Sequence, residues 1–230
     1  MKKVLVYAEG QTEETFIRDV LGPHLAQMSI YLTPVLARTR RTASGTTYKG
    51  GVVSYGQVRR DIRRLLGDTS ASLVTTMMDY YGLPDDFPGR AQIPPGTPYE
   101  RVSFLENAFR EDINHPRFLP FLTLHEFESL LFARPDEIAM AFPGTKGTNQ
   151  WVQEISGLPP EEIDEGQDAH PVARIARCFP QYRKPVHGLL IARRIGLPTI
   201  RYHCPHFDEW VRKLESLPGC KENLCPTHVS

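Results

Sequence analysis

Near its N-terminus the chain reads Lys3-Val4-Leu5-Val6-Tyr7-Ala8-Glu9-Gly10-Gln11-Thr12-Glu13-Glu14-Thr15-Phe16, a segment with the pattern of a strand, a tight turn and a helix. The apolar, β-prone run from Val4 to Ala8 predicts a strand that ends at Glu9. Thr12 then occupies the position of a helix N-cap, with acidic residues in the first turn and Phe16 on the buried face. This pattern places Glu9 at the carboxyl end of the first strand.

The position of Glu9 is one at which enzymes bind ligands. In an open α/β sheet, ligands bind in the crevice beyond the carboxyl ends of the strands. The turn has neither the GxGxxG nor the GxxxxGK[ST] pattern that cradles nucleotide phosphates. A carboxylate at such a position, without a phosphate-binding loop, is typical of a metal ligand. The alternative is an exposed acid that is stabilised by the positive end of the helix dipole.

The composition is that of a globular protein. The 230 residues are 40% hydrophobic and 23% charged, which suits one large domain or at most two small ones. No window approaches the roughly 20 apolar residues of a membrane span. The N-terminus also lacks a signal-peptide pattern, so we expect a cytoplasmic protein without a membrane partner. The four cysteines, Cys178, Cys204, Cys220 and Cys225, lack paired zinc-site spacing and are expected to be free thiols.

Charge is unevenly distributed, although the formal net charge is +0. Residues 38–64 contain eight Lys or Arg residues against one acid, whereas residues 147–173 contain six acids and no Lys or Arg. A solvated basic face is one explanation of the first segment, and a surface that contacts phosphates is the other. In the second case, the expected nucleic-acid-binding residues are Arg38, Arg40, Arg41, Lys49, Arg59 and Arg63.

Strand and helix patterns alternate along the chain. β-prone runs predict strands at 30–36, 71–78 and 118–124, and helical periodicity predicts helices at 13–26, 57–66, 100–111 and 129–133. Pro23 is expected to bend or end the first helix. Strands that are separated by helices form parallel crossovers, so we expect an α/β fold with a mostly parallel sheet flanked by helices. We expect one domain, with a core at 1–133, helical and loop additions at 134–217 and a flexible tail at 218–230.

Acidic residues follow three of the predicted strands. Glu9 follows the first strand, Asp79 follows the strand at 71–78, and Glu126 and Glu128 follow the strand at 118–124. Because the carboxyl ends of parallel strands meet at one edge of a sheet, we expect these acids to converge. Carboxylates in such proximity repel one another unless a cation or a shared proton intervenes. The pattern therefore predicts a site for Mg²⁺ or Mn²⁺, which prefer oxygen ligands.

The sequence resembles known families at several motifs. Residues 6–13 resemble the opening motif of Toprim domains, which occur in primases, topoisomerases and overcoming-lysogenization-defect (OLD) nucleases. Together with the motifs at 79–84, 124–128 and 204–207, this segment is similar to a bacterial Toprim-like family, domain of unknown function 4276, over nearly residues 3–217. The resemblance implies a Toprim-like, Rossmann-like sheet.

The resemblance also implies roles for single residues. In Toprim nucleases, a glutamate after the first strand and an Asp-x-Asp after a later strand hold Mg²⁺. Glu9 matches the glutamate and Asp79 the first aspartate, whereas Tyr81 stands at the second aspartate and puts a complete two-metal site in doubt. Substitutes for that aspartate are Asp85, Asp86, Glu126 or Glu128.

The acids at 126 and 128 resemble acidic positions after the next strand of OLD nucleases. Two residues apart, they point to opposite faces of an extended segment, so we expect one ligand and favour Glu126. Lys184 resembles a basic residue that stabilises the transition state. The predicted catalytic residues are Glu9, Asp79, Glu126 and Lys184, and the predicted metal ligands are Glu9, Asp79, Glu126 and Glu128.

The function implied by the resemblance is that of a Mg²⁺- or Mn²⁺-dependent nuclease or related phosphoryl-transfer enzyme. Its substrate would be nucleic acid, DNA in preference to RNA, in the setting of defence against foreign DNA. One alternative is a subunit that acts only with a partner ATPase. The other is a non-catalytic module that binds nucleic acid or protein, which the tyrosine at position 81 favours. A homo-oligomeric state stays open.

Overall fold

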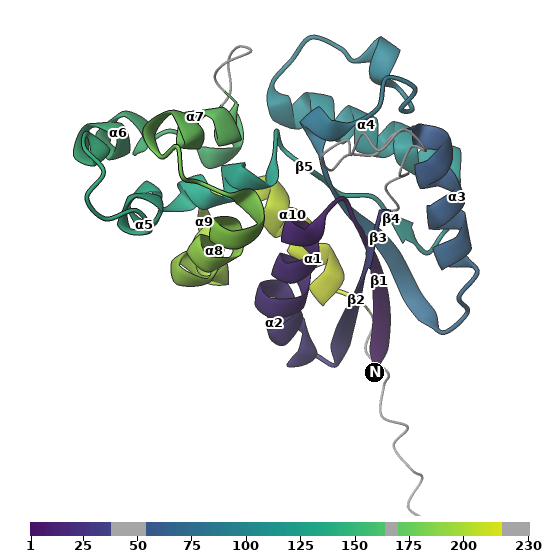
Figure 1. Cartoon of the computed structure of the whole chain (residues 1–230). Helices are drawn as coiled ribbons and strands as arrows, with labels where there is room; N and C mark the ends of the chain where they lie inside the picture. Colours follow the sequence, from purple (N-terminus) through teal and green to yellow (C-terminus); the bar gives the residue numbers. More distant parts are fainter. Residues whose placement is uncertain (38–53, 164–169, 218–230) are drawn as a thin grey trace, which may run out of the picture.

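The computed structural model describes residues 1–37, 54–163 and 170–217 (Figure 1). Several sequence predictions lie outside these ranges. They are the basic loop with Arg38, Arg40, Arg41 and Lys49, part of the acidic segment, the tail at 218–230, and Cys220 and Cys225.

A parallel β-sheet lies at the centre of the molecule (Figure 1). Its strands are β1 (Lys2–Ala8), β2 (Ile30–Leu36), β3 (Ala71–Asp79), β4 (Phe118–Leu119) and β5 (Leu122–Thr123). The strand order is β2-β1-β3-β4, and β5 pairs with the end of β3. Each of these pairs is parallel, which confirms the predicted α/β fold with a mostly parallel sheet.

Helices cover both faces of the sheet (Figure 1). Along β1, Val4 and Val6 point into one hydrophobic cluster, and Leu5 and Tyr7 point into the other, because successive strand residues face opposite sides. The first cluster lies under α1 (Gln11–Phe16), α2 (Gly22–Ala26) and α10 (Pro205–Glu215), and the second under α3 (Tyr55–Leu66) and α4 (Pro98–Ile113). The helices predicted at 57–66 and 100–111 are confirmed, each beginning two residues earlier.

The first helix differs from its predicted boundaries. Its N-cap residue is Gly10, and Thr12 lies buried within the first turn, so the prediction that Thr12 caps the helix was wrong. Pro23 does not end the helical run, which continues to Ala26. A π-helical turn, Ile17–Leu21, precedes this proline and widens the hydrogen-bond spacing at the point where proline has no N–H to donate.

The strand predicted at 118–124 is divided into β4 and β5. Pro120, between them, has no backbone N–H for the ladder. The hydroxyl of Thr76 on β3 replaces the missing backbone pairing, since it accepts from Phe121 N–H and donates to Phe121 O, both at 2.8 Å. The break advances the chain along β3, so that β5 pairs with Met78 and Asp79 at the carboxyl edge.

A largely helical lobe follows β5 (Figure 1). In order it contains a 3₁₀ helix Phe127–Ala133, α5 (Pro135–Met140), α6 (Thr148–Ile155), a 3₁₀ helix Pro160–Glu162, α7 (Pro171–Cys178), a π-helical turn Lys184–Gly188, α8 (Leu189–Ile195) and α9 (Leu197–His203). The lobe shares the hydrophobic cluster of α1 through Leu130 and Ile191. Within the described ranges, every helix is too short or too polar to cross a membrane.

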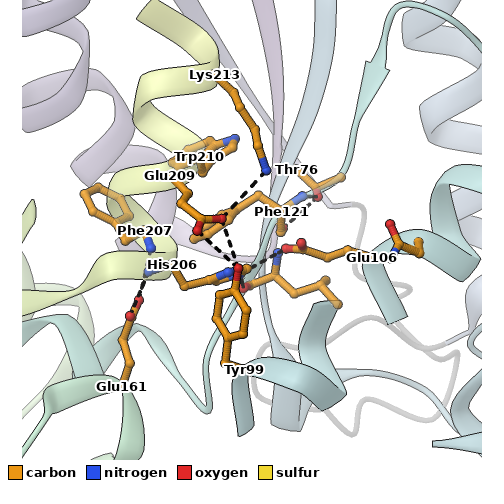
Figure 2. Close-up of polar contacts among 12 residues, drawn as sticks. Thr76, Tyr99, Glu106, Phe121, Glu161, His206, Phe207, Glu209, Trp210 and Lys213 are labelled. Carbon is orange, nitrogen blue, oxygen red and sulfur yellow. Dashed lines mark hydrogen bonds and ion pairs between the residues drawn. The ribbon is translucent and has the colours of Figure 1, made fainter. Parts of the chain in front are cut away.

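The motif at 204–207 forms the N-terminus of α10 (Figure 2). The carboxylate of Glu161 accepts the backbone N–H groups of His206 and Phe207 at 2.9 and 3.0 Å. His206 Nε2 lies 3.1 Å from Glu106 Oε1, on α4. A carboxylate at a helix N-terminus satisfies free N–H groups and complements the helix dipole. The motif therefore anchors α10 to α4 and to the 3₁₀ helix at Pro160–Glu162.

Trp210 connects the next turn of α10 to the sheet by a ring contact and a hydrogen bond (Figure 2). Its ring stacks on Phe121 with centroids 4.3 Å apart, and its Nε1–H donates to Thr75 Oγ1 at 2.9 Å. Phe121 is thus held by Thr76 on its backbone and by Trp210 on its ring. These contacts fix the chain where it enters the carboxyl edge of the sheet.

Candidate active site

Two acids meet at the carboxyl ends of neighbouring strands. Glu9 follows β1, and Asp79 is the last residue of β3. The backbone N–H of Asp79 donates to Glu9 Oε2 at 2.9 Å, and Asp79 Oδ1 in turn accepts the N–H of Phe127 at 2.9 Å. The parallel topology therefore brings these acids together as the sequence indicates, and the backbone fixes their orientation.

Lys184 lies between three acidic side chains. Its Nζ is 2.7 Å from Asp79 Oδ2 and 3.3 Å from both Glu13 Oε1 and Glu128 Oε2. The side chain begins at the first residue of the π-helical turn Lys184–Gly188 and is 30% exposed. The structure thus joins this lysine to the end of β3, to α1 and to the segment after β5.

Glu128, rather than Glu126, belongs to the cluster around the lysine. Glu128 is fully buried in the 3₁₀ helix, and its Oε1 accepts a hydrogen bond from the Tyr182 hydroxyl at 2.9 Å. Glu126 Oε2 instead accepts Val172 N–H at 3.0 Å, and its Oε1 lies 3.7 Å from His170 Nδ1. The arrangement therefore does not support our preference for Glu126. Its role as a ligand stays a prediction.

Glu13 is a site residue that the sequence reasoning missed. The acids of the first helical turn were assigned to the helix dipole, yet Glu13 is only 2% exposed and contacts Lys184. The available signal was its spacing, since it precedes the buried residues Phe16 and Ile17 by three and four positions. Residues at this spacing share a helix face, so an acid there is directed inward.

Gly82 allows the loop after β3 to pack on Glu9. A Cβ atom at Gly82 would lie 2.6 Å from Glu9 Oε1. Any larger residue at this position would displace the carboxylate. The close packing on Glu9 therefore explains why the motif at 79–84 contains a glycine at this position.

Tyr81, at the position of the second aspartate, is tied to a neutral histidine. Its hydroxyl lies 3.0 Å from His125 Nδ1, and His125 Nε2 lies 2.9 Å from Glu161 O. Since Glu161 O can only accept, Nε2 carries the proton and Nδ1 accepts from the tyrosine. Burial lowers the pKa of His125, which is consistent with this neutral tautomer. Tyr81 thus presents an uncharged, 38% exposed ring in the segment that follows Asp79.

Burial and mutual repulsion alter the pKa values of the acids. Burial, with the Asp79 carboxylate, raises the pKa of Glu9 to about 8. Burial likewise raises the pKa of Glu13, and raises the pKa of Glu128 to about 7 against the opposing effect of Lys184. Burial lowers the pKa of Lys184, but the surrounding carboxylates more than offset this and leave it well above its ordinary value. The lysine is therefore charged, and the cluster holds more acid than its charge can neutralise.

The donor chemistry of the cluster suits a hard divalent cation. Its side-chain oxygens all come from carboxylates, which Mg²⁺ and Mn²⁺ prefer. Among the described residues, the buried oxygens Glu13 Oε1 and Glu128 Oε2 accept no hydrogen bond and meet only the lysine ammonium at ion-pair distance. Within these same ranges, no three His, Cys, Asp or Glu side chains are placed so as to hold a metal ion. The chemistry fits, but the carboxylates surround an ammonium group.

Two of the predicted nucleic-acid-binding residues are described by the structure. Arg59 and Arg63 lie on α3, where Arg63 is exposed and Arg59 Nε is 2.8 Å from Asp112 Oδ2. Their contact with nucleic acid stays a prediction.

Comparison with known proteins assigns the chain to a family. No curated protein sequence matches it. Among solved structures, it is similar to the C-terminal region of the OLD protein of Xanthomonas campestris pv. campestris, with 14% identity and a TM-score of 0.37 over 93% of this chain and 97% of that one. Residues 8–215 match the family described as Domain of unknown function (DUF4276). Because this match spans most of the chain, the protein belongs to the DUF4276 family.

Proposed function

We propose that this protein is a Mg²⁺- or Mn²⁺-dependent nuclease, or a related phosphoryl-transfer enzyme, that acts on nucleic acid. The observation that carries the proposal is the contact of Lys184 Nζ with Asp79, Glu13 and Glu128, beside Glu9. Buried carboxylates around a charged lysine at the carboxyl edge of a parallel sheet favour a reaction centre over a stabilising ion pair, because burying several like charges is costly.

The residues that would hold the cation are Glu9, Glu13, Asp79 and Glu128. When bound, a divalent cation stabilises charge on a phosphoryl group and lowers the pKa of a water molecule. The chain itself orients the ligands, since backbone N–H groups fix Glu9 and Asp79 and the Tyr182 hydroxyl fixes Glu128. Such preorganisation avoids reorganisation during the reaction.

Lys184 supplies the positive charge of the site. Its ammonium group contacts the same carboxylates and its side chain is 30% exposed, so the lysine can approach a phosphate that binds there. A cation beside a phosphoryl group stabilises the negative charge that builds up in the transition state. Arg59 and Arg63 would contact the nucleic-acid backbone without reading its sequence.

The test is cleavage of supercoiled plasmid with Mn²⁺ and with Mg²⁺. Wild-type protein is expected to nick the plasmid, whereas Glu9→Gln and Asp79→Asn should each lower the rate by about 100-fold because they remove a ligand charge. Glu209→Gln is the matched control, since Glu209 is an exposed acid on α10 outside the cluster. It should cleave like wild type.

Other results would favour the alternatives. Cleavage that starts only when a partner ATPase is added would indicate a partner-dependent subunit. A wild-type protein that binds DNA but leaves it intact, with Glu9→Gln indistinguishable from it, would indicate a binding module. The neutral Tyr81 at the second-aspartate position is the observation that favours the binding module. An intact plasmid together with no metal binding would contradict the proposed function.

A further inference from the structure

The Lys184 ammonium lies between three of the four acids, and the fourth, Glu9, is joined to Asp79 through its backbone. The ammonium group contacts Asp79, Glu13 and Glu128 at 2.7 to 3.3 Å. These contacts come from one side-chain atom. A small divalent cation bound by the same oxygens at about 2.1 Å would have to take that position, and two cations cannot share it.

The acids themselves have little freedom to rearrange. Glu13 and Glu128 are 2% and 0% exposed, and Asp79 is 6% exposed. Asp79 and Glu128 are held by the hydrogen bonds from Phe127 N–H and the Tyr182 hydroxyl. The carboxylates can therefore make only the small inward movements that metal–oxygen distances require, and the ammonium group between them is the component that can be exchanged.

Lys184 has the freedom that the acids lack. Its side chain is 30% exposed and has four flexible carbons. The same turn is open to solvent at Val186, which is 62% exposed. The residue also begins a π-helical turn, a type of turn that is often found at functional sites. The ammonium can leave the carboxylates by rotation of the lysine side chain, without unpacking the hydrophobic core.

Charge provides the reason for an exchange. Three carboxylates contact one ammonium group, and two of their buried oxygens, Glu13 Oε1 and Glu128 Oε2, accept no hydrogen bond from the described residues. A divalent cation carries twice the charge of the lysine and tolerates several oxygen ligands at once. It would satisfy those oxygens better than the lysine does.

From these observations we propose that Lys184 and a divalent cation compete for one set of carboxylates, so that Lys184 keeps the site closed until the cation displaces its ammonium group. The inference rests on the proposed function, because it presumes metal binding. The displaced ammonium would then be free to approach a phosphate. Competition of this kind weakens the apparent affinity for the metal, since only the fraction of molecules with the lysine displaced can bind it.

The first test measures Mn²⁺ binding by isothermal titration calorimetry, with the full chain and without nucleic acid. Lys184→Met keeps the length of the side chain but removes the competing charge, so it should bind Mn²⁺ about tenfold more tightly than wild type. Lys213→Met is the matched control, since Lys213 is an exposed lysine on α10, 4.0 Å from Glu209. It should bind Mn²⁺ like wild type.

The second test uses wild-type protein and does not depend on the folding of a variant. Acetylation of lysines by an activated ester is followed by mass spectrometry, with and without Mn²⁺. An ammonium group hydrogen-bonded among carboxylates reacts slowly, so Mn²⁺ should accelerate acetylation of Lys184 several-fold and leave Lys213 unchanged.

The outcomes separate the two proposals. Equal or weaker Mn²⁺ binding by Lys184→Met, or Mn²⁺ binding by wild type without a change in Lys184 acetylation, would overturn the competition and leave the metal-dependent function standing. Absence of Mn²⁺ binding by wild type and by both variants would overturn the proposed function and the competition together.

Discussion

Single residues at the carboxyl edge have roles that depend on very short distances. Gly82 shows this, because its backbone packs so closely on Glu9 that a Cβ atom would lie 2.6 Å from the carboxylate oxygen. The Glu9 carboxylate also accepts a hydrogen bond from the backbone N–H of Asp79. A small change at this glycine therefore acts on two acids at once.

Gly82→Ala is expected to displace the Glu9 carboxylate and to lower plasmid cleavage by roughly tenfold to 100-fold, since small misplacements of reacting groups have effects of this size. Its free energy of unfolding should fall by about 1–2 kcal/mol. Gly56→Ala is the control, because its nearest neighbour beyond the helix backbone is Arg60 Nη1 at 3.7 Å. It should gain about 0.5–1 kcal/mol of stability and keep full activity. Unaltered cleavage by Gly82→Ala would contradict the steric role of this glycine.

Which site residues are predictable depends on how local their signal is. Glu9 and Asp79 each follow a continuous apolar strand, so the pattern along the chain is enough to find them. Glu13 could have been found from its spacing to Phe16. Tyr182 gives no such signal, because its partner Glu128 lies 54 positions earlier and only tertiary packing brings the two together.

Among the elements, the junction between β4 and β5 takes its backbone hydrogen bonds to β3 from one hydroxyl group. Thr76 is fully buried, and its side chain provides both hydrogen bonds to the backbone of Phe121. A buried backbone group that loses its partner costs about 1–3 kcal/mol. The path of the chain into the site therefore rests on this side chain.

Thr76→Val should lower the free energy of unfolding by about 2 kcal/mol, because valine preserves the shape of threonine but leaves both backbone groups of Phe121 unpaired. Urea denaturation measures this loss. The comparison is Thr33→Val on the edge strand β2, where the side chain is exposed, and the expected change is within about 0.5 kcal/mol. Equal stability of the two variants would show that the hydroxyl is dispensable.

The pattern of elements was largely predictable, whereas their local irregularities were not. Apolar runs are sufficient to place β1, β2 and β3, and helical periodicity places α3 and α4, because these elements bury one continuous face. The π-helical turn before Pro23 and the division at Pro120 depend on where the neighbouring groups find hydrogen-bond partners. A single sequence does not contain that information.

In the whole molecule, the buried acids couple stability to pH. In the folded chain the pKa of Glu9 is about 8 and that of Glu128 about 7, against an ordinary value of 4.5. From about pH 4.5 to about pH 8, the folded chain therefore binds more protons than the unfolded chain, and the free energy of unfolding falls as pH rises. The stabilising contribution of the protonated acids is complete at low pH and is lost as pH rises through these values.

Melting temperatures in EDTA should accordingly decrease by several degrees from about pH 6.5 to about pH 8.5. A Glu9→Gln, Glu128→Gln double variant should lose most of this dependence, since glutamine does not titrate. Differential scanning calorimetry of the two proteins in matched buffers provides the measurement. A wild-type melting temperature that rises across this window relative to the variant would contradict the assigned pKa shifts.

The separation in sequence between the acids and Lys184 determines when the site can form during translation. Lys184 follows Asp79 by 105 positions, and Glu9 and Glu13 precede both. A ribosome that adds 5–20 residues per second needs roughly 5 to 20 seconds for this interval. During that time the nascent chain carries its acidic ligands without the ammonium group that neutralises them. The form of the site with the lysine in place thus requires synthesis beyond Lys184, and no shorter translation intermediate can adopt it.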